Sequence, residues 1–426
     1  MKTQMNRYPR ILIVGTTPYN PSESSRALDT YFHNWPKENL HMIFSNSNKP
    51  IKGHCESLFQ ITDYDVFQVF LKKQKSAGRI FDYDDLENES APLEEQQKLL
   101  KYKKKNTFRF YARKALWSKN RWLSEELINW VDEFKPEAIY ICFSDDYFIL
   151  NISYYLAKKY SIPVICQIGD DYYFKKNKNL FIKPYLHSYK KLFKKIMSLG
   201  GFGVYISDKL ADKYNSHFSL HGYPFYLSSD IKWSQVKSRF EFNYFGKINL
   251  GRDQTLAMLG DALNKIDNSF VVNVYSKDVS SKVIKLLLKH HCFFKDTLPY
   301  NDVMSIMNSG SFNIIASGFR KKDVEATRYS LSTKVSDSLA SSGPLIAIGP
   351  NGDGAIDFLK PKNCAILIGN KRIDIDCLRE KIFDKKYLST LIENAHNIFS
   401  SMFLVDNNRL RFEENCRKIT ELAKNE

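Results

Sequence analysis

Short apolar runs alternate with helical patterns along the first half of the chain. The run RILIVG (10–15) has the length and composition of a buried strand, and RALDTYFHNW (26–35) carries its apolar residues at helical spacing. The same succession returns in AIYICF (138–143), in YFILNISYYLAKKY (147–160) and in VICQIG (164–169). Buried strands that alternate with helices are typical of a parallel α/β sheet.

The pattern begins again after HGYPFYLSSDIKWSQVKS (221–238), which predicts a second α/β domain. Strands are expected at EFNYFG (241–246), FNIIAS (312–317) and LIAIG (345–349), with helices between them. We predict domains at residues 1–225 and 239–385, and helices at 386–426 that cross back to the first domain. Residues 50–120 lack a clear periodicity and carry no prediction.

Two successive α/β domains imply a cleft between them. Ligands of open α/β sheets bind beyond the carboxyl ends of the strands. The candidate binding loops therefore come after the strands that end at Gly15, Phe143, Gly169, Gly246, Tyr275, Ser317 and Gly349.

Composition adds one strong signal, a formal net charge of +16 over 426 residues. Much of this charge lies in two aromatic-rich stretches, KYKKKNTFRFYARKALWSKNRW (101–122) and YYFKKNKNLFIKPYLHSYKKLFKK (172–195). Such stretches fit an anionic membrane surface, where aromatic residues lie at the interface and lysines meet the headgroups. They equally fit stacking on nucleic-acid bases, or a solvated basic face over buried aromatics.

The seven cysteines are scattered, without a CxxC pair or a His/Cys cluster at zinc spacing. Their odd number, and the apolar runs that hold several of them, predict reduced thiols in a cytosolic protein. No apolar stretch is long enough to predict a membrane-spanning helix, and no secretory leader is expected. Three Asp-x-Asp pairs lie in irregular regions, and we assign no metal to them.

The stretch STKVSDSLASSGP (332–344) predicts a helix with Ser332 or Thr333 as its N-cap and Lys334 in its first turn. That end of a helix presents unpaired N–H groups and partial positive charge, so a lysine there favours a bound anion. The alternative is an ordinary surface ion pair between Lys334 and Asp337, three residues on.

The segment FGKINLGRD holds a second basic turn, in which Gly246 ends a strand and Lys247 and Arg252 precede or open the next helix. Glycine permits close backbone approach, and arginine can grip a phosphate with two hydrogen bonds. Together with the turn at Lys334 it predicts a diphosphate clamp. The sequence has neither GxGxxG after the first strand nor GxxxxGK[ST], which argues against dehydrogenase and P-loop classes.

Asp170 and Asp171 come directly after the strand VICQIG and are candidates for an acid or base in the cleft. The alternative is that they end the strand and cap the next helix. Nucleophilic catalysis has little support, because there is no GxSxG and no histidine in a recognisable pairing with serine or cysteine.

The segment RYSLSTKVSDSLASSGPLIAIGP (328–350) resembles the donor-binding pattern of glycosyltransferases with the GT-B architecture, which has two Rossmann-like domains facing each other across a cleft. The resemblance is to family 4-like enzymes (glycosyltransferase group 1) of bacterial surface polysaccharide synthesis, such as capsule or exopolysaccharide. In that pattern an acidic residue precedes a proline by seven positions, as Asp337 precedes Pro344 here. The first glutamate of the family's pair falls at Tyr329, and the histidine that the family often places after the strand occupied here by VICQIG is replaced by Asp170-Asp171.

The resemblance implies a glycosyl transferase, with a retaining outcome favoured, that uses a nucleotide diphosphate sugar of UDP or GDP type and needs no other cofactor and no metal. The acceptor would be a carbohydrate or a lipid-linked sugar. The two basic aromatic stretches would then serve as a peripheral docking surface on the anionic inner face of the plasma membrane, in a protein expected in the cytoplasm. The residues that would contact the donor diphosphate are Gly246, Lys247, Arg252, Ser332, Thr333 and Lys334. Asp337 would hold the ribose, and Gly15 and Thr16 would form a loop near the acceptor.

Two alternatives remain open at this point. A non-catalytic nucleic-acid-binding protein would explain the charge and the aromatic residues. A GT-B relative that binds nucleotide without transferring sugar would be consistent with Tyr329.

Overall fold

The chain divides into two compact units, Met1–Pro224 with Arg409–Glu426, and Phe225–Asn408. The computed structural model describes residues 7–19, 26–46, 50, 53–81, 107–174, 179–229, 231–234, 239–277 and 279–425. The segment 386–426, which was predicted to cross back to the first domain, is divided between the units. Its residues up to Asn408 belong to the second unit, and Arg409–Glu426 belong to the first. Each unit is a Rossmann-like domain, and we treat the two separately.

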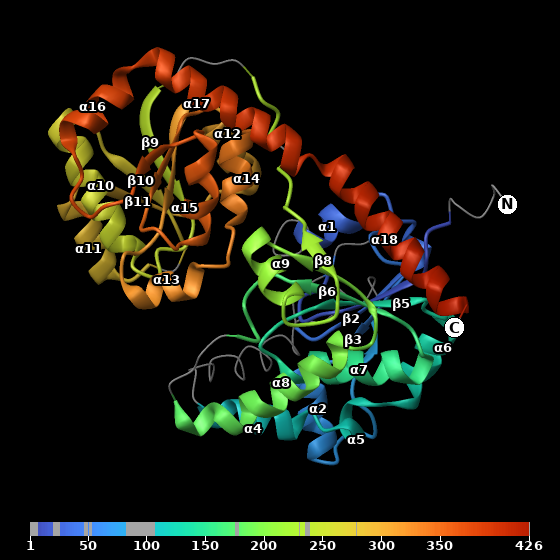
Figure 1. Ribbon diagram of the computed structural model, residues 1–426. Coiled ribbons are helices and arrows are strands. Elements are labelled where there is room, and N and C mark those ends of the chain that lie inside the picture. The colour runs from blue at the N-terminus through green and yellow to red at the C-terminus, as the bar shows by residue number, and fades with distance from the viewer. Residues whose placement is uncertain are drawn as a thin grey trace. The chain divides into compact units, whose positions relative to one another are not determined.

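The first unit is built on an eight-stranded sheet in the order β4-β3-β2-β1-β5-β6-β7-β8 (Figure 1). All neighbours pair in parallel except β4, which runs antiparallel to β3 at one edge. The central strands are continuous apolar runs because both faces of the sheet are covered. The strands are β1 (Ile11–Val14), β2 (Leu40–Phe44), β3 (Ser57–Gln60), β4 (Arg79–Ile80), β5 (Ala138–Cys142), β6 (Val164–Ile168), β7 (Gly201–Tyr205) and β8 (Gly222–Pro224).

Helices cover both faces of this sheet, with α1 and α18 on one side and α6, α7 and α8 on the other (Figure 1). Several begin with a side-chain cap, for example Ser124 before α6 and Ser207 before α9. The helical segments are α1 (Arg26–Phe32), η1 (Lys37–Asn39), α2 (Asp63–Phe70), α4 (Thr107–Leu116), α5 (Lys119–Trp122), α6 (Glu125–Phe134), α7 (Tyr147–Tyr160), η3 (Leu180–Ile182), α8 (Lys183–Met197), α9 (Asp208–Asn215) and α18 (Val405–Asn425).

The second unit contains a six-stranded, all-parallel sheet in the order β11-β10-β9-β12-β13-β14. Its core joins apolar residues of the strands, such as Phe242 and Phe312, to the inner faces of α10, α16 and α17. The strands are β9 (Arg239–Phe245), β10 (Val272–Tyr275), β11 (Cys292–Lys295), β12 (Ser311–Ala316), β13 (Leu345–Ile348) and β14 (Ile366–Ile368).

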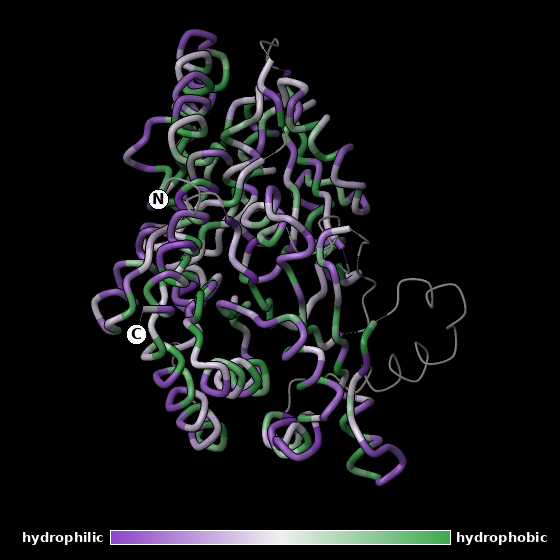
Figure 2. The backbone as a smooth tube through the Cα atoms, turned by 90° about the vertical axis from the view of Figure 1, so that its right-hand side faces the viewer, coloured by the Kyte–Doolittle hydropathy of each residue, from purple (hydrophilic) through white to green (hydrophobic). Residues whose placement is uncertain are grey.

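In the second unit, helices connect successive strands, and α16, α17 and η5 follow the last strand. Hydrophilic and hydrophobic residues alternate along the helical coils of the chain (Figure 2), as in helices that cover a sheet. The helical segments of this unit are α10 (Arg252–Ile266), α11 (Ser281–Lys289), α12 (Tyr300–Met307), α13 (Lys321–Thr327), α14 (Thr333–Ala340), α15 (Gly354–Leu359), η4 (Lys360–Lys362), α16 (Ile375–Phe383), α17 (Lys385–Ile398) and the π-helical turn η5 (Phe399–Phe403).

The region around residues 50–120, which carried no prediction, contributes the edge strand β4, its neighbour β3 and the helices α2, α4 and α5. Residues 82–106, including the Asp82/Asp84 pair, lie outside the described residues. All seven cysteines are free thiols. Within the described ranges no helix is long and apolar enough to cross a membrane.

Each sheet has one topological switch point, where the chain leaves one side of a central strand and returns on the other. In the first unit it lies between β1 and β5, and in the second between β9 and β12. Loops at the carboxyl ends of two such strands diverge to opposite faces of the sheet and leave room for a ligand between them. The carboxyl edge at each switch point is therefore the expected position of a binding site.

Candidate functional site

The turn after β9 lies at the switch point of the second unit and holds the basic residues predicted from FGKINLGRD. Gly246 has a φ of +131°, and Gly251, with a φ of +76°, is the left-handed residue that starts α10. The buried Tyr244 fixes the turn from below, since its hydroxyl donates to the carbonyl of Lys247 at 2.8 Å. The side chain of Lys247 is exposed.

The start of α14 meets this turn. Ser332 is the N-cap of the helix, and its hydroxyl accepts from the N–H of Lys334 at 3.4 Å. A methyl group added at Gly246 would lie 2.7 Å from Nζ of Lys334 and would overlap its Cε. Alanine at this position would push the end of the lysine side chain away from the turn. The two basic turns that the sequence predicted separately are adjacent in the structure.

Arg252 ties the turn after β9 to the end of β12. Its Nε donates to the carbonyl of Ala316 at 3.1 Å, and its Nη1 to the carbonyl of Lys247 at 3.4 Å and to Oδ1 of Asn249 at 3.3 Å. Thr255 adds a bond from its hydroxyl to the carbonyl of Ser317 at 3.0 Å. Arg252 thus braces the site through backbone carbonyls, a role that the sequence did not suggest.

A further cation, Arg320, was missed by the sequence analysis. It lies after β12, and its guanidinium forms a two-bond ion pair with the buried carboxylate of Asp323, at 2.5 and 3.0 Å. A methyl group at Gly251 would lie 3.3 Å from Nη2 of Arg320, so this guanidinium is beside the start of α10. The sequence could have indicated Arg320, because this residue lies in the loop after the strand that ends at Ser317, one of the candidate binding loops.

Asp337, predicted to hold the ribose, lies one turn into α14 and is only 5% exposed. Its Oδ1 accepts hydrogen bonds from the hydroxyls of Ser229, at 2.7 Å, and Tyr300, at 3.2 Å. Neither partner was foreseen, since they are 108 and 37 residues away in the chain. Asp337 is therefore oriented by its own domain.

The acceptor-side residues belong to the first unit. Gly15 is buried at the end of β1, and a methyl group there would lie 3.2 Å from Cβ of Cys142 at the end of β5. The carbonyl of Thr16 accepts from the N–H groups of Ser45 and Asn46, at 3.1 and 2.9 Å. The loop at Gly15 and Thr16 thus lies at the switch point of this sheet.

Asp170 and Asp171 lie after β6 and differ in their surroundings. Oδ1 of Asp171 accepts from the N–H of Phe174 at 2.9 Å and from the hydroxyl of Tyr214 at 3.3 Å, so it stabilises the turn. The side chain of Asp170 is exposed.

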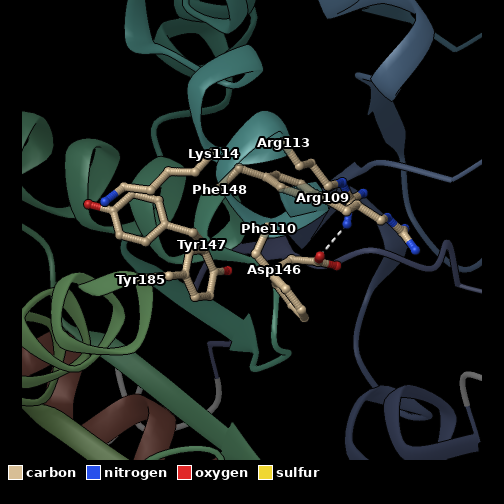
Figure 3. Close-up of a pocket in the computed structure, with 8 residues that line it drawn as sticks. All are labelled: Arg109, Phe110, Arg113, Lys114, Asp146, Tyr147, Phe148 and Tyr185. Carbon is tan, nitrogen blue, oxygen red and sulfur yellow. Dashed lines mark hydrogen bonds and ion pairs between the residues drawn. The ribbon is translucent and has the colours of Figure 1, made fainter. Parts of the chain in front are cut away.

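An aromatic pocket lies next to these loops, where α4 approaches the start of α7 and α8 (Figure 3). Its cavity of about 110 Å³ is lined by Arg109, Phe110, Arg113, Lys114, Asp146, Tyr147, Phe148 and Tyr185. A neighbouring cavity of about 80 Å³ shares Phe110 and Tyr185 and adds Asp145 and Tyr172. Because Asp146 and Tyr147 come directly after the loop that ends β5, the pocket lies at the carboxyl edge of the sheet.

Ion pairs and buried hydroxyls hold this pocket in shape. Arg113 binds Asp63, at 2.9 Å, and Asp146, so its charge is balanced within the wall. The hydroxyl of Tyr185 donates to the carbonyl of Asp145 at 2.9 Å, and burial raises the pKa of this hydroxyl, which therefore stays protonated. Partial burial lowers the pKa of Lys114, whose Nζ lies 4.5 Å from the ring centre of Tyr147.

Among the residues that the structure describes, no three histidine, cysteine, aspartate or glutamate side chains are grouped closely enough to hold a metal ion.

Comparisons with known proteins define the fold. No protein-family model and no curated protein matches the sequence. The structure is similar to that of HepE from Anabaena in complex with UDP-glucose, with a TM-score of 0.60 at 13% identity over 96% of this chain and 100% of that chain. It is also similar to a mutant of TarM from S. aureus, solved with fondaparinux, α-GlcNAc-glycerol and UDP, with a TM-score of 0.56 at 10% identity over 96% and 100%. The chain has the GT-B fold, with two Rossmann-like domains, which confirms the predicted fold class.

Proposed function

We propose that this protein is a glycosyltransferase that moves a sugar from a nucleotide diphosphate sugar, of UDP type, to a carbohydrate or lipid-linked acceptor in cell-surface polysaccharide synthesis. The observation that carries the proposal is the meeting of Gly246 and Lys334 at the switch point of the second unit. This contact brings together a lysine, the N–H groups at a helix N-terminus and a glycine turn. These groups can donate hydrogen bonds and offer positive charge to a diphosphate. The similarity in fold to proteins solved with UDP-glucose and UDP supports the same class of donor.

In the proposed reaction the bond between the sugar C1 and the β-phosphate oxygen breaks, and the acceptor oxygen forms a new bond to C1. The acceptor proton leaves to a base, and negative charge grows on the departing diphosphate. Lys334 and the N–H groups of α14 would stabilise this charge more than they stabilise the intact donor, which lowers the barrier. Arg252 would hold the turn after β9 in place. Ser332, Thr333 and Lys247 would contact the phosphates. Asp337 would bind the ribose. No metal is assigned a part, and a retaining outcome is favoured.

The acceptor is proposed to bind in the first unit, at the loop of Gly15 and Thr16 and in the aromatic pocket. Flat aromatic walls such as Tyr147 and Tyr185 suit the apolar face of a sugar ring. Asp170, exposed at the end of β6, is the proposed base, and Asp171 stabilises its turn.

Calorimetric titration of the purified protein with UDP, GDP and CMP tests the donor class. We expect UDP to bind with a Kd in the micromolar range, roughly −8 kcal/mol, and the other two at least tenfold more weakly. Tighter binding of GDP than of UDP would instead indicate a donor whose nucleobase is guanine. Failure of all three to bind would reject the donor site, and filter binding of single-stranded RNA at two salt concentrations would then test the nucleic-acid alternative.

Replacement of Asp170 with Asn should lower kcat for sugar transfer by about 100-fold or more, because a positioned base contributes on the order of 10²–10⁴ in rate. The affinity for UDP should not change. The measurement is UDP release from the donor in the presence of a panel of carbohydrate acceptors. Asp171→Asn is the matched control, and we expect it to reduce thermal stability more than kcat, since its carboxylate binds Phe174 and Tyr214. Equal kcat for wild type and Asp170→Asn would remove Asp170 from the mechanism.

A UDP-binding protein without transfer activity is the second candidate. It is favoured by Tyr329, which stands where the resembled family has a glutamate. The ring centre of Tyr329 lies 4.6 Å from the guanidinium carbon of Arg328. This second candidate predicts UDP binding without UDP release for every acceptor in the panel.

A further inference from the structure

The first unit exposes three large apolar side chains close together, next to the aromatic pocket. Phe108, at the start of α4, is 74% exposed, and Leu180 and Phe181, in η3, are 67% and 82% exposed. Leaving such side chains in water is unfavourable, and a group of them on one surface marks an interaction site.

One tyrosine joins the two segments that carry these side chains. The hydroxyl of Tyr111 donates to the carbonyl of Phe181 at 2.8 Å and accepts from the N–H of Tyr185 at 3.2 Å. Tyr111 lies three residues after Phe108 on α4 and therefore shares its helix face. Phe108, Leu180 and Phe181 thus form one apolar tip, and Figure 1 shows α4 and α8 side by side at this end of the unit.

A row of basic side chains, three of them lysines, continues from the tip along α8. Lys183, His187, Lys191 and Lys194 recur at helical spacing on one face, and all four are exposed. Neither α8 nor α4 contains an aspartate or a glutamate. The apolar tip and this lysine row together are called the basic-aromatic surface. It is not neutralised by acidic residues of its own helices.

We propose that the basic-aromatic surface docks on an anionic lipid bilayer. The apolar tip would enter the boundary between headgroups and acyl chains, and the lysine row would lie on the negatively charged headgroups. Each part alone gives weak binding, but the two act together on one surface. Stacking of nucleic-acid bases fits less well, because the aliphatic Leu180 has no ring to stack on a base.

No residue of the donor site takes part in this surface, so membrane docking and the proposed function can fail separately. If both hold, the aromatic pocket lies beside the bilayer, since Phe110 and Tyr185 line that pocket and adjoin the tip. An acceptor carried on a membrane lipid would then reach the pocket directly.

The test is cosedimentation of the full chain with vesicles of phosphatidylglycerol and phosphatidylcholine, and with vesicles of phosphatidylcholine alone. We expect binding to the anionic vesicles at low salt, and loss of most of it at about 0.3 M salt, where charge attraction is screened within several ångströms. The variant F108S/L180S/F181S should bind at least about fivefold more weakly, because it removes the apolar insertion. The variant K183Q/K191Q/K194Q should bind roughly tenfold or more weakly at low salt, since each lysine near the surface contributes to the attraction.

The chain offers a matched control for each variant. L288S/F293S/L422S removes three side chains of 49%, 47% and 56% exposure elsewhere, and K282Q/K285Q/K289Q removes the same charge from the exposed face of α11. Both controls should bind vesicles like the wild type. Circular dichroism and thermal unfolding check that every variant is folded.

Either of two results would overturn the proposal. One is that the protein stays in the supernatant with anionic vesicles at low salt. The other is that the variants and their controls lose binding equally, which would mean that net charge alone attracts the protein. Binding of single-stranded RNA that depends on the same residues, without vesicle binding, would assign the surface to nucleic acid instead.

Discussion

Replacement of Phe412 with Ala should lower the free energy of unfolding by about 3–5 kcal/mol, the usual cost of removing a buried phenylalanine side chain. Phe412 lies on α18 and is 0% exposed. Its ring packs 5.0 Å from Tyr31, 5.4 Å from Phe32 and 5.8 Å from Phe202, measured between ring centres. The C-terminal helix therefore completes the core of a unit whose other residues end near position 224.

Leu410→Ala is the control, because Leu410 lies two residues away on the same helix and is 55% exposed. We expect its cost to stay within about 0.5 kcal/mol. Urea unfolding monitored by circular dichroism gives both values. If the two variants were equally stable, α18 would not be part of the core of the first unit in solution. Removal of residues 409–426 should, for the same reason, destabilise the first unit more than the second.

Lys334→Ala should weaken UDP binding by roughly 10- to 150-fold. A hydrogen bond to a charged group contributes about 1.5–3 kcal/mol, and each 1.4 kcal/mol corresponds to a factor of ten in affinity. The expected loss is large because Lys334 is half-buried against Gly246 and shares its phosphate with the N–H groups of α14. Calorimetric titration with UDP measures it.

Lys322→Ala removes the same charge from an exposed position on α13 and is the matched control. It should change the Kd less than twofold at moderate salt, since exposed charges are screened. A twofold or smaller effect of Lys334→Ala would return Lys334 to a surface ion pair, and equal effects of both variants would indicate attraction by net charge only.

A second variant, Gly246→Ala, tests the same contact from the other side. A φ of +131° is unfavourable for any residue with a side chain, and the added methyl group would displace the amine of Lys334. We expect at least about fivefold weaker UDP binding, together with a loss of about 1–3 kcal/mol in stability from the backbone conformation. Retention of full affinity would show that Lys334 does not need its place beside the glycine.

The sequence could predict the fold class because its signals are local. A buried parallel strand is a continuous apolar run, and runs such as RILIVG, AIYICF and LIAIG stand between helical patterns at the right spacing. The two basic turns were predictable for the same reason, since a glycine at a strand end and a capped helix start are signatures of a few residues. The elements within residues 57–81 were not predicted, because an edge strand as short as β4 leaves little periodicity in the sequence.

The sequence by itself determined two α/β domains, their strand-end loops and the cations that stand in those loops. Only the tertiary structure decided which of these residues meet, because strand order, not chain order, sets neighbours in a parallel sheet. It brought Lys334 to Gly246 across 88 residues of sequence, engaged Arg252 with backbone carbonyls, placed Arg320 beside Gly251, and buried Asp337 against Ser229 and Tyr300. It also linked α4 to Phe181 through the hydroxyl of Tyr111. Such contacts depend on packing between segments far apart in the chain, which no local pattern encodes.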